Sequence, residues 1–235
     1  WSGGMTDPVA IRDALQWTAR VWGASHALLL GGGHADPRNV LGDSPESILP
    51  QWEDLDLETD DFFSGLRQSS SRSIKLALGR IPARSVDEAR SWLEKVKIFE
   101  DPARAEFGPW RNRLVLAADD MKQGDKRDAI FDHTQQLERL WREIEVVRPW
   151  LRFEKIYMLQ YPLSAQLYKP EATRDLKALL NQGVAGLLYM GHGGADILAD
   201  EKLLNVADVD RDLENDQRPF LLFAGSCSVG RHDMP

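Results

Sequence analysis

Residues 183–194 read Gly-Val-Ala-Gly-Leu-Leu-Tyr-Met-Gly-His-Gly-Gly, an apolar run of strand length that ends in a histidine between glycines. Uninterrupted apolar residues over this length predict a strand that is buried on both faces, as in a parallel sheet. In open α/β sheets, ligands and chemistry collect outside the carboxyl ends of the strands. We therefore expect His192 at such an end, where the flanking glycines allow a sharp turn and a close approach of another segment.

A second segment, residues 219–227, repeats this pattern as Pro-Phe-Leu-Leu-Phe-Ala-Gly-Ser-Cys and ends at the only cysteine of the chain. We expect a second buried strand here, and the polar, Asp-rich residues 195–218 leave room for a short helix and a crossover. His192 and Cys227 are 35 positions apart, close to the length of a βαβ unit of about 30 residues or more. Two neighbouring parallel strands would then present an imidazole and a thiol side by side, as a cysteine nucleophile and its base require.

The rest of the chain alternates between helix-like and strand-like patterns. Helices are predicted over 7–22, 85–99, 131–147 and 172–182, and strands over 26–30, 74–81, 114–118 and 155–159. The pair Asp101-Pro102 ends a helix, and the alternation starts again after it. We therefore predict an α/β fold of two side-by-side three-layer subdomains with mainly parallel sheets. The expected subdomains are residues 1–104 and 105–235.

Composition and charge exclude several classes of protein. The 235 residues carry a formal net charge of −8 and no basic cluster, so nucleic acid is not an expected partner. One cysteine excludes an internal disulfide. No apolar run is long enough to span a bilayer, and no signal peptide is recognised. We expect the parent protein to continue before Trp1 and after Pro235.

A glycine run at residues 31–37, Gly-Gly-Gly-His-Ala-Asp-Pro, offers an alternative function. A dinucleotide site needs Gly-x-Gly-x-x-Gly opening a helix, whereas Pro37 argues for a loop. His34 is then an ordinary loop residue. A small-molecule or nucleotide-binding α/β domain that uses Gly31 to Gly33 would show a helix directly after Gly33.

Three motifs carry a resemblance to a known family: Gly-His-Gly-Gly at 191–194, Phe-Ala-Gly-Ser-Cys at 223–227 and Leu-Gly-Arg-Ile-Pro at 78–82. Together they resemble the gingipain-type cysteine peptidases, which have a caspase-like fold. Within that family the chain is most similar to the signal peptidase (sortase) of the type IX secretion system. The similarity extends to 60–63, 110–112 and 230–235. The chain departs from the family pattern at Asp196, one position past the place where relatives often carry Glu, and at Ser226, where relatives carry Thr or another residue.

The resemblance implies that the second subdomain is the caspase-like catalytic one of a cysteine endopeptidase. Cys227 would be the nucleophile and His192 its proton-transfer partner. Asp120 is our candidate for the residue that orients His192, because an acidic residue at the corresponding strand end has this role in the gingipains. Asp119 is nearly as good a candidate.

The remaining site residues are backbone donors and near neighbours of the pair. The peptide N–H groups of Gly193 and Cys227 stand at strand exits, where they would stabilise an oxyanion. Gly194 and Ser226 complete the set expected to bind oxyanion or substrate.

Neither a cofactor nor a metal ligand is identified. Calcium stays open, because some relatives hold it although no compact carboxylate loop marks a site here. The expected partners are a protein or peptide substrate and components of a secretion machinery, and the expected location is secreted or at the outer-membrane surface of a bacterium. The alternative is a catalytically inactive peptidase-fold binding module. Loss of the histidine or the cysteine would mark such a module, and both are present.

Overall fold

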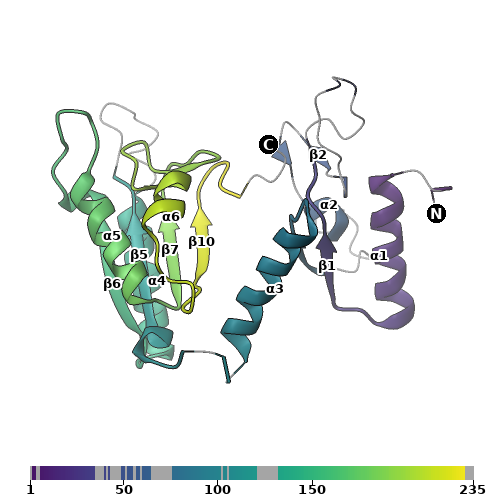
Figure 1. Cartoon of the computed structure of the whole chain (residues 1–235), viewed down its shortest axis with the longest axis horizontal. Coiled ribbons are helices and arrows are strands. Elements are labelled where there is room, and N and C mark those ends of the chain that lie inside the picture. Colours follow the sequence, from purple (N-terminus) through teal and green to yellow (C-terminus); the bar gives the residue numbers. More distant parts are fainter. Residues whose placement is uncertain are drawn as a thin grey trace. The chain divides into compact units, whose positions relative to one another are not determined.

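The structure, a computed structural model, describes residues 2, 3, 6–34, 40, 42, 49, 50, 52–54, 57, 58, 60–64, 76–101, 103, 104, 106–120 and 132–230. It is an α/β fold with mainly parallel sheets, as predicted (Figure 1). The chain divides into two compact units, Trp1–Leu93 with Arg231–Pro235, and Glu94–Gly230. The division falls inside a helix, and the expected domain limit between residues 104 and 105 stays a prediction. None of the described helices is long and apolar enough to cross a membrane.

The first unit is built on a pair of parallel strands. Its elements are α1 (Pro8–Trp22), β1 (His26–Leu30), β2 (Glu53–Asp54), β3 (Leu57–Glu58), α2 (Asp61–Ser64), β4 (Ala77–Ile81) and the start of α3 (Val86–Glu100). Strand β1 pairs with β4, and β2 pairs antiparallel with β3. Helix α1 begins as expected, because the Asp7 carboxylate accepts the Val9 N–H at 2.8 Å and so satisfies one free donor of the first turn.

The glycine run after β1 serves packing inside this unit. A Cβ added at Gly32 would lie 3.0 Å from Cγ of Arg84 and 3.2 Å from the Pro82 carbonyl oxygen. The nucleotide-binding alternative requires a helix directly after Gly33. His34 is not helical, and residues 35–39 lie outside the described part of the chain. The local structure therefore gives this alternative no support.

The second unit alternates strands and helices in the predicted order. Its elements are the end of α3, η1 (Pro109–Asn112), β5 (Arg113–Ala118), α4 (His133–Val147), β6 (Arg152–Tyr157), η3 (Met158–Gln160), α5 (Pro170–Gln182), β7 (Gly186–Met190), β8 (Ile197–Leu198), β9 (Leu204–Asn205), α6 (Val206–Asp212) and β10 (Leu221–Gly225). The main sheet has the order β10-β7-β5-β6, and all of its pairs are parallel. The two strands that lead to His192 and Cys227 are therefore neighbours, as predicted.

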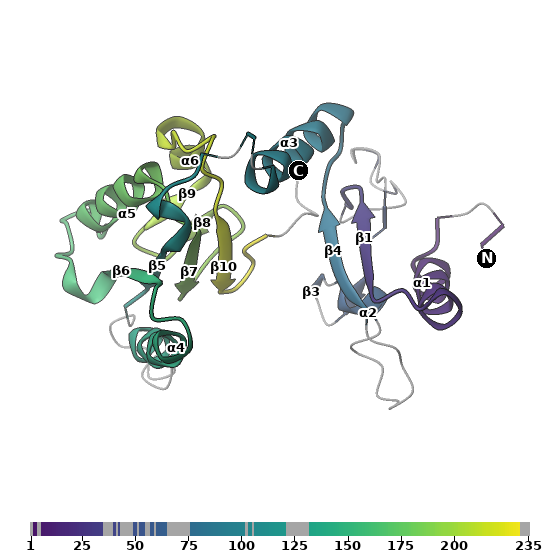
Figure 2. The ribbon, with the colours of Figure 1, turned by 90° about the horizontal axis from the view of Figure 1, so that it is seen from below.

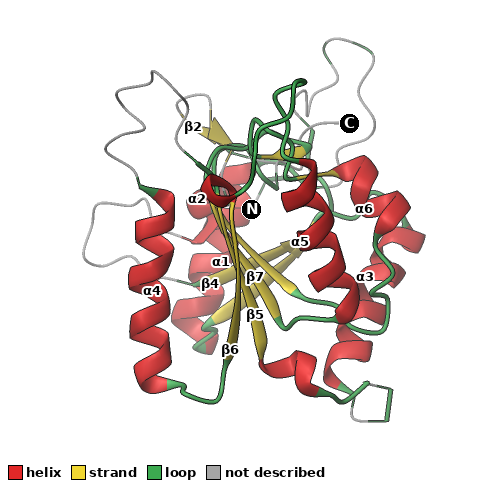
Figure 3. Cartoon of the chain, turned by 90° about the vertical axis from the view of Figure 1, so that its left-hand side faces the viewer, coloured by secondary structure: helices red, strands yellow, loops and turns green. Residues whose placement is uncertain are grey.

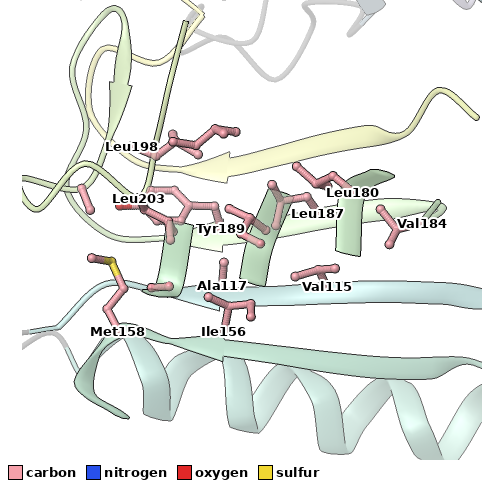
Figure 4. Packing of buried hydrophobic residues seen from close by; sticks show 14 residues of the cluster. Val115, Ala117, Ile156, Met158, Leu180, Val184, Leu187, Tyr189, Leu198 and Leu203 are labelled. Carbon is pink, nitrogen blue, oxygen red and sulfur yellow. The ribbon is translucent and has the colours of Figure 1, made fainter. Parts of the chain in front are cut away.

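Helices cover both faces of this sheet (Figures 2 and 3). On one face Leu180 of α5 lies with Leu187 and Tyr189 of β7 in the largest buried cluster of the described residues (Figure 4). Leu176 of α5 belongs to the same cluster. On the other face Leu137 of α4 joins a smaller cluster with residues of β5. Burial of this apolar surface makes the second unit a three-layer α/β structure.

The expectation of a second buried strand is wrong for β10. Leu221 is 73% exposed and Phe223 is 62% exposed, whereas β7 is mostly buried. The physical reason is position, since β7 lies between β5 and β10, while β10 pairs only with β7 among the described strands. An apolar run indicates a strand but not the number of its neighbours.

Candidate active site

His192 and Cys227 leave neighbouring strands at matched positions. In the ladder between β7 and β10, Met190 lies opposite Gly225, and each candidate residue follows two positions later. Beyond the ladder, the Gly191 N–H still donates to the Gly225 carbonyl at 3.2 Å. The Cys227 thiol is free and exposed. The sheet register thus brings the two segments to one carboxyl edge.

Asp119, directly after β5, contacts the histidine from the next strand. Its Oδ2 lies 2.8 Å from Nδ1 of His192 and accepts the His192 peptide N–H at 3.0 Å. Asp119 is only 2% exposed. A carboxylate at Nδ1 fixes the ring orientation and favours the tautomer in which Nδ1 carries the proton and Nε2 is unprotonated.

This geometry corrects the choice of Asp120 as the residue that orients the histidine. The Asp120 carboxylate turns away to Nζ of Lys169, at 2.7 Å. Successive side chains of an extended segment point to opposite faces of the sheet, so two adjacent aspartates direct their carboxylates to different partners. Asp119, our second candidate, is the one directed at His192.

The backbone at His192 is held as firmly as its ring. The hydroxyl group of Tyr189 donates to the His192 carbonyl at 2.5 Å, and the Ala199 N–H donates to the same oxygen at 3.0 Å. Burial raises the pKa of the Tyr189 hydroxyl, and nearby Asp119 adds to the effect. Tyr189 therefore stays protonated and serves as a hydrogen-bond donor at neutral pH.

Burial also changes the pKa of the Asp119 carboxyl group. Burial raises the pKa of Asp119, while the hydrogen bonds from His192 act in the opposite direction. An acid in this position is ionised most readily when the imidazole beside it is protonated, because the two charges stabilise each other. The pair is thus suited to hold a histidine that gains and loses a proton.

Two glycines allow the histidine segment to pass between its neighbours. Gly191 has φ +158°, and a Cβ there would lie 2.2 Å from Cβ of Asp119. A Cβ at Gly193 would lie 2.3 Å from Oγ of Ser226 and 3.1 Å from the Cys227 carbonyl oxygen. Real Cβ atoms do not approach this closely, so both positions need glycine for steric reasons.

The expected backbone donors differ in their availability. Gly193 forms a β-bridge with Leu198. The hydrogen bonds of this bridge are made by the residues on either side of the pair, not by Gly193 and Leu198 themselves. None of the described hydrogen bonds uses the Gly193 N–H. The Gly194 N–H donates to the Ile197 carbonyl at 2.9 Å, so Gly194 is not an oxyanion donor in this arrangement. Ser226 was expected to bind the oxyanion or the substrate. Its Oγ is instead buried beside Gly193, and it has no hydrogen-bond partner among the described atoms.

Sequence reasoning missed His133 as a neighbour of the site. Its ring packs edge-to-face against that of His192, with centroids 5.6 Å apart, and both of its ring nitrogens are buried without a partner in the described structure. His133 begins α4, which follows β5. The first turn of a helix that follows a parallel strand starts near the carboxyl edge of the sheet, and this was the available signal.

Acidic groups line the space beside Asp119. A cavity of about 250 Å³ is bordered by Asp119, Asp120, Asp132, His133, Thr134 and Leu159. Carboxylate oxygens of Asp119, Asp120 and Glu201 lie within 4.8 Å of one another. The ammonium group of Lys169 already pairs with this cluster, so we assign no metal to it.

The fold, the Asp119–His192 pair and an exposed cysteine after the neighbouring strand match the class indicated by the motifs. The sequence profile of peptidase family C25 matches residues 1–235, so the chain belongs to this family. The resemblance to gingipain-type peptidases is thereby confirmed.

Solved structures of gingipains show the same fold. The Arg-specific cysteine proteinase gingipain R (RgpB) superposes with a TM-score of 0.66 at 15% identity, over 97% of this chain and 47% of that one. A complex of the pro- and mature domains of RgpB from Porphyromonas gingivalis gives a TM-score of 0.61 at 15% identity, over 93% and 46%. The chain thus spans about half the length of these proteins. No curated protein sequence matches it significantly.

Proposed function

We propose that this chain is the catalytic part of a cysteine endopeptidase in which Cys227 is the nucleophile. His192 transfers the proton, and Asp119 orients His192. The observation that carries this proposal is the contact between Asp119 and Nδ1 of His192, on a strand whose neighbour leads to Cys227. Membership of peptidase family C25 supports the class of reaction.

The reaction follows from these positions. Nε2 of His192 takes the proton of the Cys227 thiol, because Nδ1 faces Asp119, and the thiolate attacks the carbonyl carbon of the scissile bond. The C–N bond then breaks, and the imidazolium gives its proton to the leaving amine. Water, activated by the same imidazole, hydrolyses the thioester and releases the free thiol.

The peptide N–H of Gly193 is the first donor for the oxyanion of the tetrahedral intermediate. It is not used by any described hydrogen bond, and a Cβ there would lie 3.1 Å from the Cys227 carbonyl oxygen. The N–H of Cys227 is the second proposed donor. Such donors stabilise the negative charge that develops on the carbonyl oxygen.

The proposed setting is the processing of secreted proteins at the surface of a bacterium, in type IX secretion. The motifs at 191–194 and 223–227 support this setting, because they resemble those of the signal peptidase of that system. Components of the secretion machinery are the proposed partners.

The test is covalent labelling of the longer parent protein. A peptide with an electrophilic carbonyl should attach to Cys227, located by mass spectrometry of the digest. Cys227→Ala and His192→Ala should each abolish peptide cleavage and leave the circular dichroism unchanged. The double variant should be little worse than either single variant, because the two groups act as one unit. His26→Ala, an exposed histidine of the other unit, is the matched control and should keep full activity.

Retained cleavage by Cys227→Ala would exclude the cysteine-peptidase mechanism. A wild-type protein that binds peptides but neither cleaves them nor reacts with the probe would be an inactive binding module.

A further inference from the structure

A buried lysine lies behind the candidate site. Lys169 directly precedes α5, and its side chain is only 5% exposed. Its ammonium group donates to Oδ2 of Asp120 at 2.7 Å and to the Met158 carbonyl at 2.7 Å. A buried charge needs such partners, because the loss of hydration is otherwise costly. The proton transfers described above do not use this ion pair.

The ion pair is connected to His192 through Asp119. The Asp120 N–H donates to Oδ1 of Asp119 at 2.9 Å, while Oδ2 of Asp119 contacts the histidine. Each oxygen of Asp119 is therefore held by a different group. Because Lys169 fixes the side chain of Asp120, it also restrains the peptide unit that holds Asp119.

We propose that Lys169 is a positioning residue of this site, which acts through Asp120 to keep the Asp119 carboxylate directed at Nδ1 of His192. The inference rests on the proposed peptidase function and deepens it. Lys169 touches neither substrate nor reacting atoms.

The charges of the cluster give Lys169 a second effect on the same pair. Oxygens of Asp119, Asp120 and Glu201 lie within 4.8 Å of one another. Burial raises the pKa of Glu201 and Asp119 raises it further, whereas Lys169 lowers it. In the described part of the chain, Lys169 is the one lysine or arginine that forms an ion pair with any of these three acids. Without it, three acids share one partly buried site, and such crowding favours protonation.

The direction of the resulting pH effect follows from the groups around Asp119. These are Tyr189 and His192 from β7 and its exit, Asp120 from the same loop, Glu201 from the turn after β8, Lys169 before α5, and His133 of α4 behind His192. Removal of the ammonium group makes the local potential more negative. It should therefore raise the pKa of the Asp119 carboxyl and of the His192 imidazole together.

Lys169→Met tests the proposal in the parent protein, because it keeps the length of the side chain and removes the charge. We expect kcat/KM to fall by about tenfold, since hydrogen-bonded networks of charged groups lose more than one contact when a member is removed. The pH optimum should move upward. Lys169→Arg should recover activity and the original profile. Lys169→Met with Asp120→Asn should recover part of the loss, because the carboxylate that lost its direct partner is then neutral.

Lys177→Met is the matched control. Lys177 lies in α5, the helix that Lys169 precedes; it is 21% exposed and pairs with Asp212 at 2.7 Å. It should leave both kcat/KM and the pH profile unchanged. A profile that stays in place for Lys169→Met, with kcat/KM within twofold of wild type, overturns the proposal.

A second measurement does not depend on turnover. In the Cys227→Ala background, ¹⁵N NMR of the His192 ring reports its tautomer and its titration. Lys169→Met should raise the titration midpoint and weaken the preference for a proton at Nδ1. An unchanged His192 titration overturns the role of Lys169 even if the protein is not a peptidase. Should Lys169→Met fail to fold, Lys169→Gln removes the same charge with a polar side chain and gives the same reading.

Discussion

One carboxylate oxygen of Asp119 contacts His192 at two points, the ring Nδ1 at 2.8 Å and the peptide N–H at 3.0 Å. Asp119 directly follows β5, and its own N–H donates to the Met190 carbonyl at 3.0 Å. The histidine is therefore aligned by the sheet itself. Side chain and backbone are fixed by the same acid, which gives the site little freedom to rearrange.

Asp119→Asn should lower kcat by roughly a hundredfold or more, because an amide opposite Nδ1 favours the wrong tautomer of the imidazole. Steady-state kinetics of the parent protein measure the effect, and circular dichroism should show an intact fold. Asp175→Asn, a change of an α5 carboxylate remote from His192, should keep normal activity. A loss of less than twofold in Asp119→Asn would contradict the assigned role.

Gly191→Ala should damage stability and activity together. The new Cβ would lie 2.2 Å from Cβ of Asp119 and 2.6 Å from the Tyr189 hydroxyl, so strands β5 and β7 must move apart. Overpacking of this kind costs about 1–3 kcal/mol. Urea unfolding measures the loss. Gly79→Ala, where the new Cβ would be 3.5 Å from Leu28, should cost less, and equal losses in the two variants would argue against the close contact.

Gly193→Val should impair catalysis more than folding, for a reason that the sequence did not reveal. Its side chain would meet Ser226 and Val229 and displace the exposed loop that carries Cys227. Movement of Cys227, the proposed nucleophile, would then lower activity. Because Oγ of Ser226 is the nearest atom, Ser226→Gly should partly restore Gly193→Ala. Parallel loss of stability and activity would instead make Gly193 a purely structural residue.

Glu201→Gln should make the protein more stable at neutral pH and leave it unchanged in acid. Burial and Asp119 raise the pKa of Glu201 in the folded state. A raised folded-state pKa means that the protonated acid favours folding, and that this contribution disappears as the pH rises through the folded pKa. The stabilising difference should appear above the ordinary value of 4.5. Thermal unfolding from pH 3 to 8 measures it, and a difference that is constant with pH would contradict this account.

His133→Phe should keep activity and should not destabilise the fold. It preserves the ring that packs on His192 and removes two buried nitrogens that lack partners among the described residues; buried polar atoms without partners cost free energy. His133→Ala should lower kcat/KM, because it removes the support of the imidazole. Equal activity of the two variants would show that this contact has no part in positioning His192.

Much of the fold was predictable because local patterns agree with tertiary structure. The helix after Asp7 and the strand before His192 were found from a cap and an apolar run, and both are packed as those patterns require. The exposure of β10 was not predictable. A run such as Leu221 to Phe223 has the same composition at the edge of a sheet as in its middle.

The sequence predicted only part of the candidate site. Glycines and a lone cysteine at strand ends indicated His192 and Cys227. The choice between Asp119 and Asp120 depends on which of the two side chains points to His192 at the end of β5. A shift of the strand by one residue would exchange their positions. Lys169 is 49 positions from Asp120 in the sequence, and no local pattern of the chain indicates their contact.

Cys227, the proposed nucleophile, and His192 follow strands that differ in their number of neighbours. Asp119 and His192 follow β5 and β7, which have neighbouring strands on both sides. Cys227 follows β10, which is an edge strand of the described sheet. Amide hydrogens of edge strands exchange with solvent after small local openings. Those of central strands exchange only when a larger part of the sheet opens. Detachment of β10 alone would remove Cys227 from an otherwise intact Asp119–His192 pair. Heat should therefore inactivate this site at a lower temperature than it melts β5, β6 and β7.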